Sequence, residues 1–183
     1  MIVEEPGVPA VTMAEAQAFV RIETGEEEAL LAGLVRTACG LCEAFINQAL
    51  TTRQFREDLT ASGQWQRLGR SPVQAILSVE AVGIDGVATP LPAGSHGVDI
   101  DASGDGWVRV TDVGAARRVR VTATAGMAAS SNEVPEPLRQ GILRLVAHLF
   151  ASRDGDGGEP PAAVTALWRP YRRMRLSSAR SSA

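Results

Sequence analysis

The stretch Glu26–Leu50, EEEALLAGLVRTACGLCEAFINQAL, decides how the rest of the chain can fold. Its apolar residues recur every three or four positions, which is the spacing of an amphipathic helix and not the alternation of a strand. The glutamates at its start suit the positive end of a helix dipole. We therefore predict a long helix at the centre of a packed helical core. The residues predicted to form its apolar stripe are Leu30, Leu31, Leu34, Ala38, Leu41, Cys42, Phe45, Ile46 and Ala49.

The residues before this stretch predict an arm and a short helix. Residues 1–10 contain two prolines and no periodicity, so we expect them to be extended. Thr12-Met13-Ala14-Glu15 has the capping-box pattern, in which each of the two outer side chains accepts a hydrogen bond from the other residue's backbone N–H. The helix that starts there is expected to include Ile22 and to end at Thr24-Gly25.

The texture of the chain changes between Thr51 and Gly126, where glycine and proline punctuate short runs rich in valine, isoleucine and threonine. Arg118–Thr122 alternates polar and apolar residues, which indicates an antiparallel sheet with one face towards water. Asp85-Gly86 is a hairpin-turn sequence. Strands are predicted near residues 53–59, 64–68, 76–84, 97–100, 107–111 and 117–123.

Helical periodicity returns after Pro135. Asp154–Glu159 is predicted to be a flexible hinge, and Pro160-Pro161 to open a last short helix that Pro170 ends. The apolar face of the helix after Pro135 is predicted to contain Leu138, Ile142, Leu145, Val146 and Leu149, with Arg139, Gln140 and Arg144 facing out.

Together these segments predict one α+β domain over residues 1–183. A helical-bundle core of about four helices comes from residues 12–50 and 135–172. An antiparallel β insertion at residues 53–126 lies between the second and third long helices. Residues 173–183 are predicted to be a flexible tail. We expect no membrane span, because polar residues interrupt every long apolar run, and no secretory leader, so the chain should be made in the cytoplasm.

No group of residues predicts catalysis, a metal site or a cofactor. Cys39 and Cys42 form a Cys-x-x-Cys, but inside a helix they are expected to be buried structural thiols. Asp99–Asp105 matches the first half of a calcium loop, yet Val110 stands where the closing glutamate should be, so a polar hairpin turn is expected. His148 is expected to pack on its helix and His96 to lie in a loop. An enzyme whose site these patterns miss is a distant alternative.

Charge is distributed unevenly along the chain. Residues 1–50 hold eight glutamates against two arginines, whereas the segment from Pro160 onward holds five arginines and no acid. Such polarity suits head-to-tail self-association or docking on a charged partner. A solvated acidic end and a solvated basic tail explain the same distribution.

Arginine clusters raise a second possible function, a regulatory protein that binds nucleic acid. The strand Arg117-Arg118-x-Arg120 and the tail Arg172-Arg173-x-Arg175 could each bind phosphate. Against this, the chain has a net charge of −3, and no aromatic residues alternate with the arginines to stack on bases. A basic tail that docks on an acidic protein surface fits equally well.

The order of several short motifs resembles the head–tail connector (adaptor) proteins of tailed bacteriophages, in the variety with a β insertion in a helical core. The resemblance covers about residues 11–172 and lies in the order and spacing of the motifs. They are Val11–Ala16 with Val20-Arg21, Ala29-Leu30-Leu31, Arg70–Gln74, Val79, Ile84-Asp85-Gly86, Val119–Gly126, Val134–Ile142, His148–Arg153 and Leu167–Arg172.

The resemblance implies a structural role in the neck of a virion or phage-like particle. Proteins of this family form a ring, commonly a dodecamer, beneath the portal protein, where they extend the DNA channel and dock the next neck or tail-completion protein. DNA passes through without sequence-specific contact. The same module serves in prophages and in gene transfer agents.

Two sets of residues are assigned hypothetical contacts on this basis. Arginines and a tyrosine near the C-terminus are expected to dock on the portal, and charged residues of the long helix to contact the next subunit or to line the channel. The portal-docking residues are Arg169, Tyr171, Arg172, Arg173 and Arg175. The ring-contact or channel-lining residues are Glu26, Glu27, Arg36 and Glu43.

Overall fold

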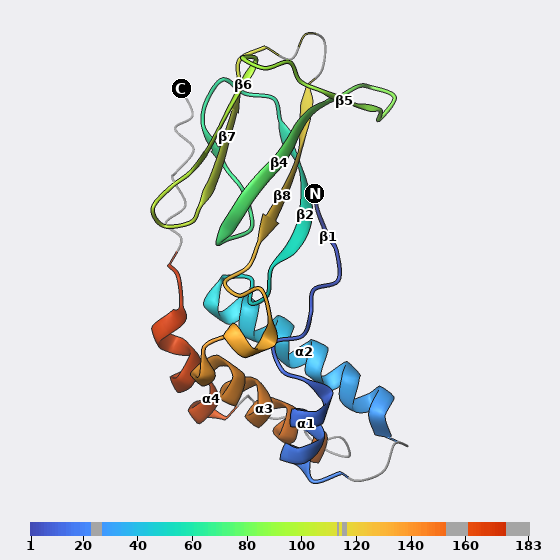
Figure 1. Cartoon of the computed structure of the whole chain (residues 1–183), viewed down its shortest axis with the longest axis vertical. Coiled ribbons are helices and arrows are strands. Elements are labelled where there is room, and N and C mark those ends of the chain that lie inside the picture. Colours follow the sequence, from blue (N-terminus) through green and yellow to red (C-terminus); the bar gives the residue numbers. More distant parts are fainter. Residues whose placement is uncertain (23–26, 113, 115–116, 153–160, 175–183) are drawn as a thin grey trace.

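The computed structural model places the helices at one end of an elongated molecule and the strands at the other (Figure 1). It describes residues 1–22, 27–112, 114, 117–152 and 161–174. The elements are, in order, β1 (Ile2–Glu4), α1 (Met13–Val20), α2 (Glu28–Ile46), β2 (Arg53–Thr60), β3 (Gln66–Arg67), β4 (Val73–Val82), β5 (Ala88–Pro90), β6 (His96–Ile100), β7 (Gly106–Val110), β8 (Arg118–Ala125), η2 (Ser131–Glu133), α3 (Glu136–Ala151), α4 (Ala162–Trp168) and η3 (Arg169–Tyr171). The predicted α+β class is confirmed.

Two antiparallel sheets build the strand end. One has five strands in the order β1-β2-β8-β4-β5, and the other has three in the order β3-β7-β6. Valine and alanine residues of β8 alternate into the interior, where they pack with Phe55 and Leu68 in a cluster separate from the helical core. The turn at Asp85-Gly86 joins β4 to β5 as predicted, with Gly86 at a φ of 83° that favours glycine.

The sheets differ from the prediction in two respects. The three-residue strands β1 and β5 were not predicted, and β1 joins the five-stranded sheet from the segment expected to be an unpaired arm. The β region therefore includes a strand that precedes the helices. His96, expected in a loop, is the first residue of β6. Such short edge strands exist because a partner strand offers hydrogen bonds, which periodicity does not reveal.

The capping box at the start of α1 is confirmed. The Glu15 backbone N–H donates to Thr12 Oγ1 at 3.2 Å, and the Thr12 backbone N–H donates to Glu15 Oε2 at 2.8 Å. The helix ends at Val20, before the predicted end, because Arg21 adopts a left-handed conformation with φ 58°. The predicted terminator Thr24-Gly25 lies outside the described residues. Glu15 also pairs with Arg139 of α3, so Arg139 is largely buried and does not face out as expected.

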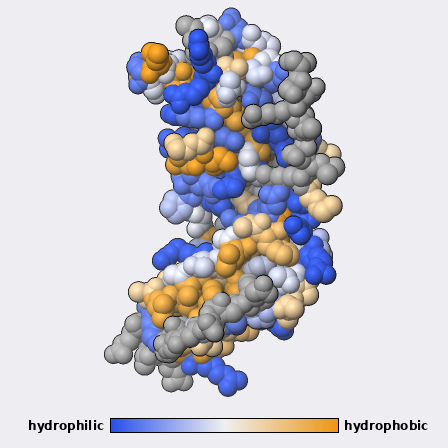
Figure 2. Space-filling model, turned by 180° about the vertical axis from the view of Figure 1, so that it is seen from behind, coloured by the Kyte–Doolittle hydropathy of each residue, from blue (hydrophilic) through white to orange (hydrophobic). Residues whose placement is uncertain are grey.

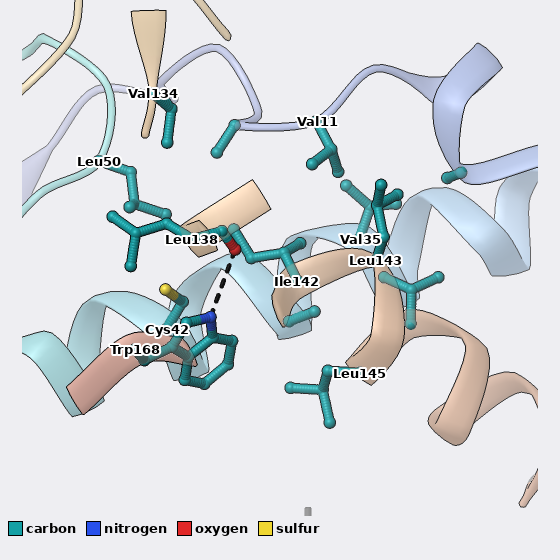
Figure 3. Packing of buried hydrophobic residues seen from close by; sticks show 14 of the residues in the cluster. Val11, Val35, Cys42, Leu50, Val134, Leu138, Ile142, Leu143, Leu145 and Trp168 are labelled. Carbon is teal, nitrogen blue, oxygen red and sulfur yellow. Dashed lines mark hydrogen bonds between the residues drawn. The ribbon is translucent and has the colours of Figure 1, made fainter. Parts of the chain in front are cut away.

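The helical core packs α2, α3, α1 and α4 around a single apolar cluster. Trp168 of α4 is 2 % exposed and donates its indole N–H to the Leu138 carbonyl at 3.3 Å (Figure 3). Its ring centroid lies 5.9 Å from that of Phe45. Gly141 makes this possible, because a Cβ there would overlap the indole. The last short helix is thus part of the folded core.

Helix α2 is shorter than predicted, and part of its predicted stripe is wrong. It ends at Ile46, where Asn47 adopts φ 57°. Leu30 and Leu41, predicted to be buried, are 43 % and 44 % exposed. The buried face is turned by about one residue and consists of Leu31, Val35, Ala38, Cys42 and Ile46. Seen from behind, hydrophobic residues also gather on the surface of the helical end, whereas hydrophilic residues dominate the strand end (Figure 2).

By length and composition, α2 is the one described helix apolar enough to cross a membrane. Length and composition are weak evidence for a membrane span, because a helix in the core of a globular protein passes the same test. Its five buried residues belong to the helical cluster.

Candidate assembly surfaces

A network of charged side chains joins the helical end to the five-stranded sheet. Arg53, the first residue of β2, donates from Nε to Glu4 Oε2 at 2.8 Å. Its two terminal nitrogens donate to the two carboxylate oxygens of Glu43 in α2, at 2.9 Å and 2.7 Å. Arg70 pairs with the other oxygen of Glu4. One arginine thus connects β1, β2 and α2.

Electrostatics hold this network in its charged form. Burial acts to raise the pKa of Glu4, but the hydrogen bonds and positive charges of Arg53 and Arg70 outweigh it, and the pKa lies below its ordinary value. Burial likewise acts to lower the pKa of Arg53, and the carboxylates of Glu43 and Glu4 more than reverse that effect. Glu43 also accepts the Leu50 backbone N–H at 2.8 Å, so its carboxylate already has partners within the chain.

Two hollows of about 280 Å³ each lie beside this network, and both are bordered by Gly40 and Glu43 of α2 and by Arg53. The first extends towards Arg70, between β3 and β4, and its lining mixes polar and apolar groups. The second extends along the N-terminal arm past Val8, which is 59 % exposed, and is mainly apolar. The surface on both sides of Gly40 is therefore concave.

The described members of the predicted portal-docking set follow α4 directly, and several make contacts within the chain. The Arg173 backbone N–H donates to the Ile46 carbonyl at 2.9 Å, and its side chain reaches Asp105 at 3.5 Å and the Ser103 carbonyl in the β6–β7 turn. Arg172 lies over the Phe45 ring, 5.5 Å from its centroid.

The remaining portal-docking residues differ in their contacts and in their exposure. The Tyr171 carbonyl accepts a hydrogen bond from Gln48 Nε2 at 2.7 Å. Arg169 is exposed on η3. Arg175 lies outside the described residues, as does the predicted hinge Asp154–Glu159.

The predicted ring-contact residues of α2 do not share one environment. Arg36 is exposed, whereas Glu27, at the N-cap position, is half-buried and Glu43 belongs to the charged network. Glu26 lies outside the described residues. The surface between them is apolar, since Leu30 and Leu41 reach solvent. Sequence periodicity missed this apolar surface because α2 is rich in leucine on both faces.

The arginine strand offers less free charge than its sequence suggests. Arg120 of β8 pairs with Asp58 of β2 through two hydrogen bonds of 2.8 Å and 3.0 Å. The bond from Arg120 lowers the pKa of Asp58. Arg118 is exposed beside them, as is Arg117. A phosphate would therefore have to compete with an existing carboxylate for Arg120.

The candidate metal and redox motifs have structural roles. Oδ1 of Asp101 accepts the backbone N–H groups of Ser103 at 2.8 Å and Asp105 at 3.0 Å, and Oδ2 accepts the Trp107 indole N–H at 2.9 Å. The acidic string is thus the predicted polar turn between β6 and β7. Within the described residues, no three His, Cys, Asp or Glu side chains are grouped to hold a metal ion.

The two cysteines lie on α2 as free thiols, Cys42 buried and Cys39 half-buried. Burial raises the pKa of both thiols. They therefore favour the protonated, less nucleophilic form, as expected for structural cysteines.

Comparison with known proteins gives strong structural likenesses. The chain is 30 % identical to a chain from the neck of an empty gene transfer agent (GTA) particle computed with C6 symmetry, with a TM-score of 0.77 over 98 % of this chain and 99 % of that one. It is 28 % identical to a chain of the native GTA virion (TM-score 0.76, 97 % and 98 % covered) and to one of the native GTA neck computed with C12 symmetry (0.75, 98 % and 99 %). No family model and no curated protein matches.

These likenesses cover nearly the whole of each chain, so they include the helical end, both sheets and the segment after α4. They define the protein as a structural component of the neck of a phage-like particle. The chain belongs to the head–tail connector (adaptor) family shared by tailed bacteriophages and gene transfer agents.

Proposed function

We propose that this chain is the head–tail connector that forms a ring beneath the portal, extends the DNA channel and docks the next neck or tail protein. The observation that carries the proposal is the 30 % identity to a GTA neck chain over 98 % of the sequence. Two of the similar necks have C6 and C12 symmetry, which supports an oligomeric ring and is consistent with a dodecamer. A role in structure and not in catalysis accords with this family.

A ring of identical copies requires two unlike faces on each copy, because each subunit meets its neighbours head to tail. The polarised charge of the chain supplies such faces. Arg36, which is exposed, and Glu27 of α2 are proposed to contact the neighbouring copy or to line the channel. Glu43 supports that surface from within, since Arg53 fixes its carboxylate.

We propose that the portal is bound by the segment from Arg169 onward. The α4 helix before it is packed in the core, so the docking segment begins later than Pro160, where the basic segment starts. Arg169 and Arg172 are exposed and can reach a partner. Arg173 is held by Ile46 and Asp105, so it positions the start of the tail.

A truncation tests portal docking directly. A variant that lacks residues 174–183 and also carries Arg169→Ala and Arg172→Ala keeps the internal contacts of Arg173. It is expected to unfold at about the same urea concentration as the wild type but to lose portal binding in a pull-down. The matched full-length variant Arg118→Ala, on the strand end, should bind the portal normally. Unchanged portal binding by the truncated chain would refute this part of the proposal.

The channel is proposed to be lined by acidic residues, because an arginine-lined bore would hold DNA and slow its passage. An electron microscopy map of the assembled neck tests this, and arginines facing the DNA would contradict it. A separate assay on the purified monomer tests the alternative of a nucleic-acid-binding regulator. Salt-dependent DNA binding by the purified monomer, without incorporation into particles, would favour that alternative.

A further inference from the structure

The exposed side of α2 carries an apolar stripe with a repeat of seven residues. Leu30, Thr37 and Ala44 are spaced by seven, and so are Gly33 and Gly40. A seven-residue repeat keeps one seam of a helix facing a partner that crosses it at a shallow angle. Only 28 % of the most apolar part of α2 is buried inside the chain. We call this surface the α2 stripe. Its residues are Leu30, Gly33, Thr37, Gly40, Leu41 and Ala44.

Nothing in the described part of the chain explains the two glycines of the stripe. Glycine inside a helix costs about 1 kcal/mol relative to alanine. Among the described residues, a Cβ on Gly40 would meet no atom within 4 Å, and one on Gly33 would meet only the end of the Arg36 side chain at 3.9 Å. Gly141 of α3 differs, because Trp168 occupies the space beside it. Helical glycines that no described side chain approaches favour close approach by a segment of a partner molecule.

The hydrogen bonding and shape of the stripe are also compatible with burial under a partner. The Thr37 hydroxyl donates to the Gly33 carbonyl at 3.0 Å, so covering it would leave no hydroxyl without a partner. The two hollows beside Gly40 could receive side chains from a crossing segment. The two leucines of the stripe, Leu30 and Leu41, lose their contact with water when the stripe is covered.

We propose that the α2 stripe is one of the two unlike faces of the ring contact, and that a segment of the neighbouring copy crosses α2 at Gly33 and Gly40. This inference rests on the proposed function. The occupant is a second copy because two of the similar necks were computed with C6 and C12 symmetry, and every copy in a ring of that kind presents the same surface to a neighbour. The interface is then centred on small and apolar residues, with Arg36 at its edge.

The test uses the full-length variants Gly40→Leu and Leu41→Glu, with the purified portal present. Gly40→Leu adds bulk where the monomer has open space, so it should keep or raise the midpoint of thermal unfolding while blocking close approach. Mass photometry should show ring assembly weakened by about tenfold or more for each variant, which is the size expected for the centre of an interface. Leu77→Glu, at a residue 54 % exposed on β4, is the matched control and should assemble normally.

The outcomes separate the two proposals. If the wild-type chain forms rings and both α2 variants form them equally well, the inference is overturned and the proposed function stands. Equal loss in the Leu77→Glu control also overturns it, because the effect is then not specific to α2. If the wild-type chain forms no ring either alone or on the portal, the proposed function itself is overturned.

Discussion

Replacing Gly141 by alanine should destabilise the folded chain even though alanine is the better helix former. In α3 this glycine faces the indole of Trp168, and a Cβ would overlap the ring nitrogen and two ring carbons. Both partners are buried, and Trp168 is one of the α4 residues that pack in the helical core against α3. The indole must therefore move, or α3 must shift away from α4.

The expected loss follows from three contributions. Forcing an extra group into a packed core costs about 1–3 kcal/mol. Moving the indole weakens its 3.3 Å hydrogen bond to the Leu138 carbonyl, worth about 0.5–1.5 kcal/mol. In the opposite direction, the higher helix propensity of alanine stabilises the folded chain by about 1 kcal/mol. The net loss is about 0.5–3.5 kcal/mol, and each kcal/mol lowers the Tm by roughly 2–4 °C in a chain of this size.

Gly40→Ala is the matched control, because it makes the same change in the middle of a helix where the added Cβ meets nothing. It should raise the free energy of unfolding by about 0.5–1 kcal/mol. Urea unfolding followed by tryptophan fluorescence compares both variants with the wild type. The reasoning is refuted if Gly141→Ala is as stable as the wild type, or if the two glycine variants change stability in the same direction.

Three further predictions concern the cap of α1, the charged network at Glu4 and the two thiols of α2. Thr12→Ala removes the capping box of α1 and should lower stability by about 1 kcal/mol in urea unfolding; no change would show that the cap is dispensable. The pKa of Glu4 is depressed in the folded chain, so its pairing stabilises above the ordinary value of 4.5 and is lost as pH falls through the lower folded pKa. Glu4→Gln should accordingly have a lower free energy of unfolding than the wild type at neutral pH. A difference in the free energy of unfolding that does not become smaller in acid would contradict this. Cys39 and Cys42 should react slowly with iodoacetamide until urea unfolds the chain, because burial raises both pKa values, and fast labelling of the folded chain would refute it.

Features determined by neighbouring residues were predicted well from the sequence. The capping box at Thr12, the turn at Asp85-Gly86 and the apolar face of α3 each depend on interactions within a few positions. The polar turn around Asp101 was also predicted, because the string lacked the glutamate that a calcium loop needs. In these segments the local pattern and the final structure agree.

Features determined by distant contacts were predicted poorly. Strand β1 exists as the partner of β2, which follows the first two helices in the chain. Arg53 gains its importance from Glu4 and Glu43, which no spacing rule connects with it. The division of the strands into two sheets also depends on these nonlocal pairings.

The wrong prediction for Leu30 and Leu41 of α2 concerns a helix whose residues serve both the folded core and the proposed assembly surface. Periodicity finds an apolar stripe, but α2 has apolar residues on two sides, and only packing shows which side the chain itself covers. Leu31, Val35 and Ala38 face the helical core, while Leu30 and Leu41 remain for another surface. Selection for monomer stability alone would favour alanine at position 40, since nothing in the fold opposes a Cβ there. If a neighbouring copy crosses α2 at this point, Gly40→Ala should make the monomer more stable and the ring less so, and a variant that strengthened both would exclude an assembly role for this glycine.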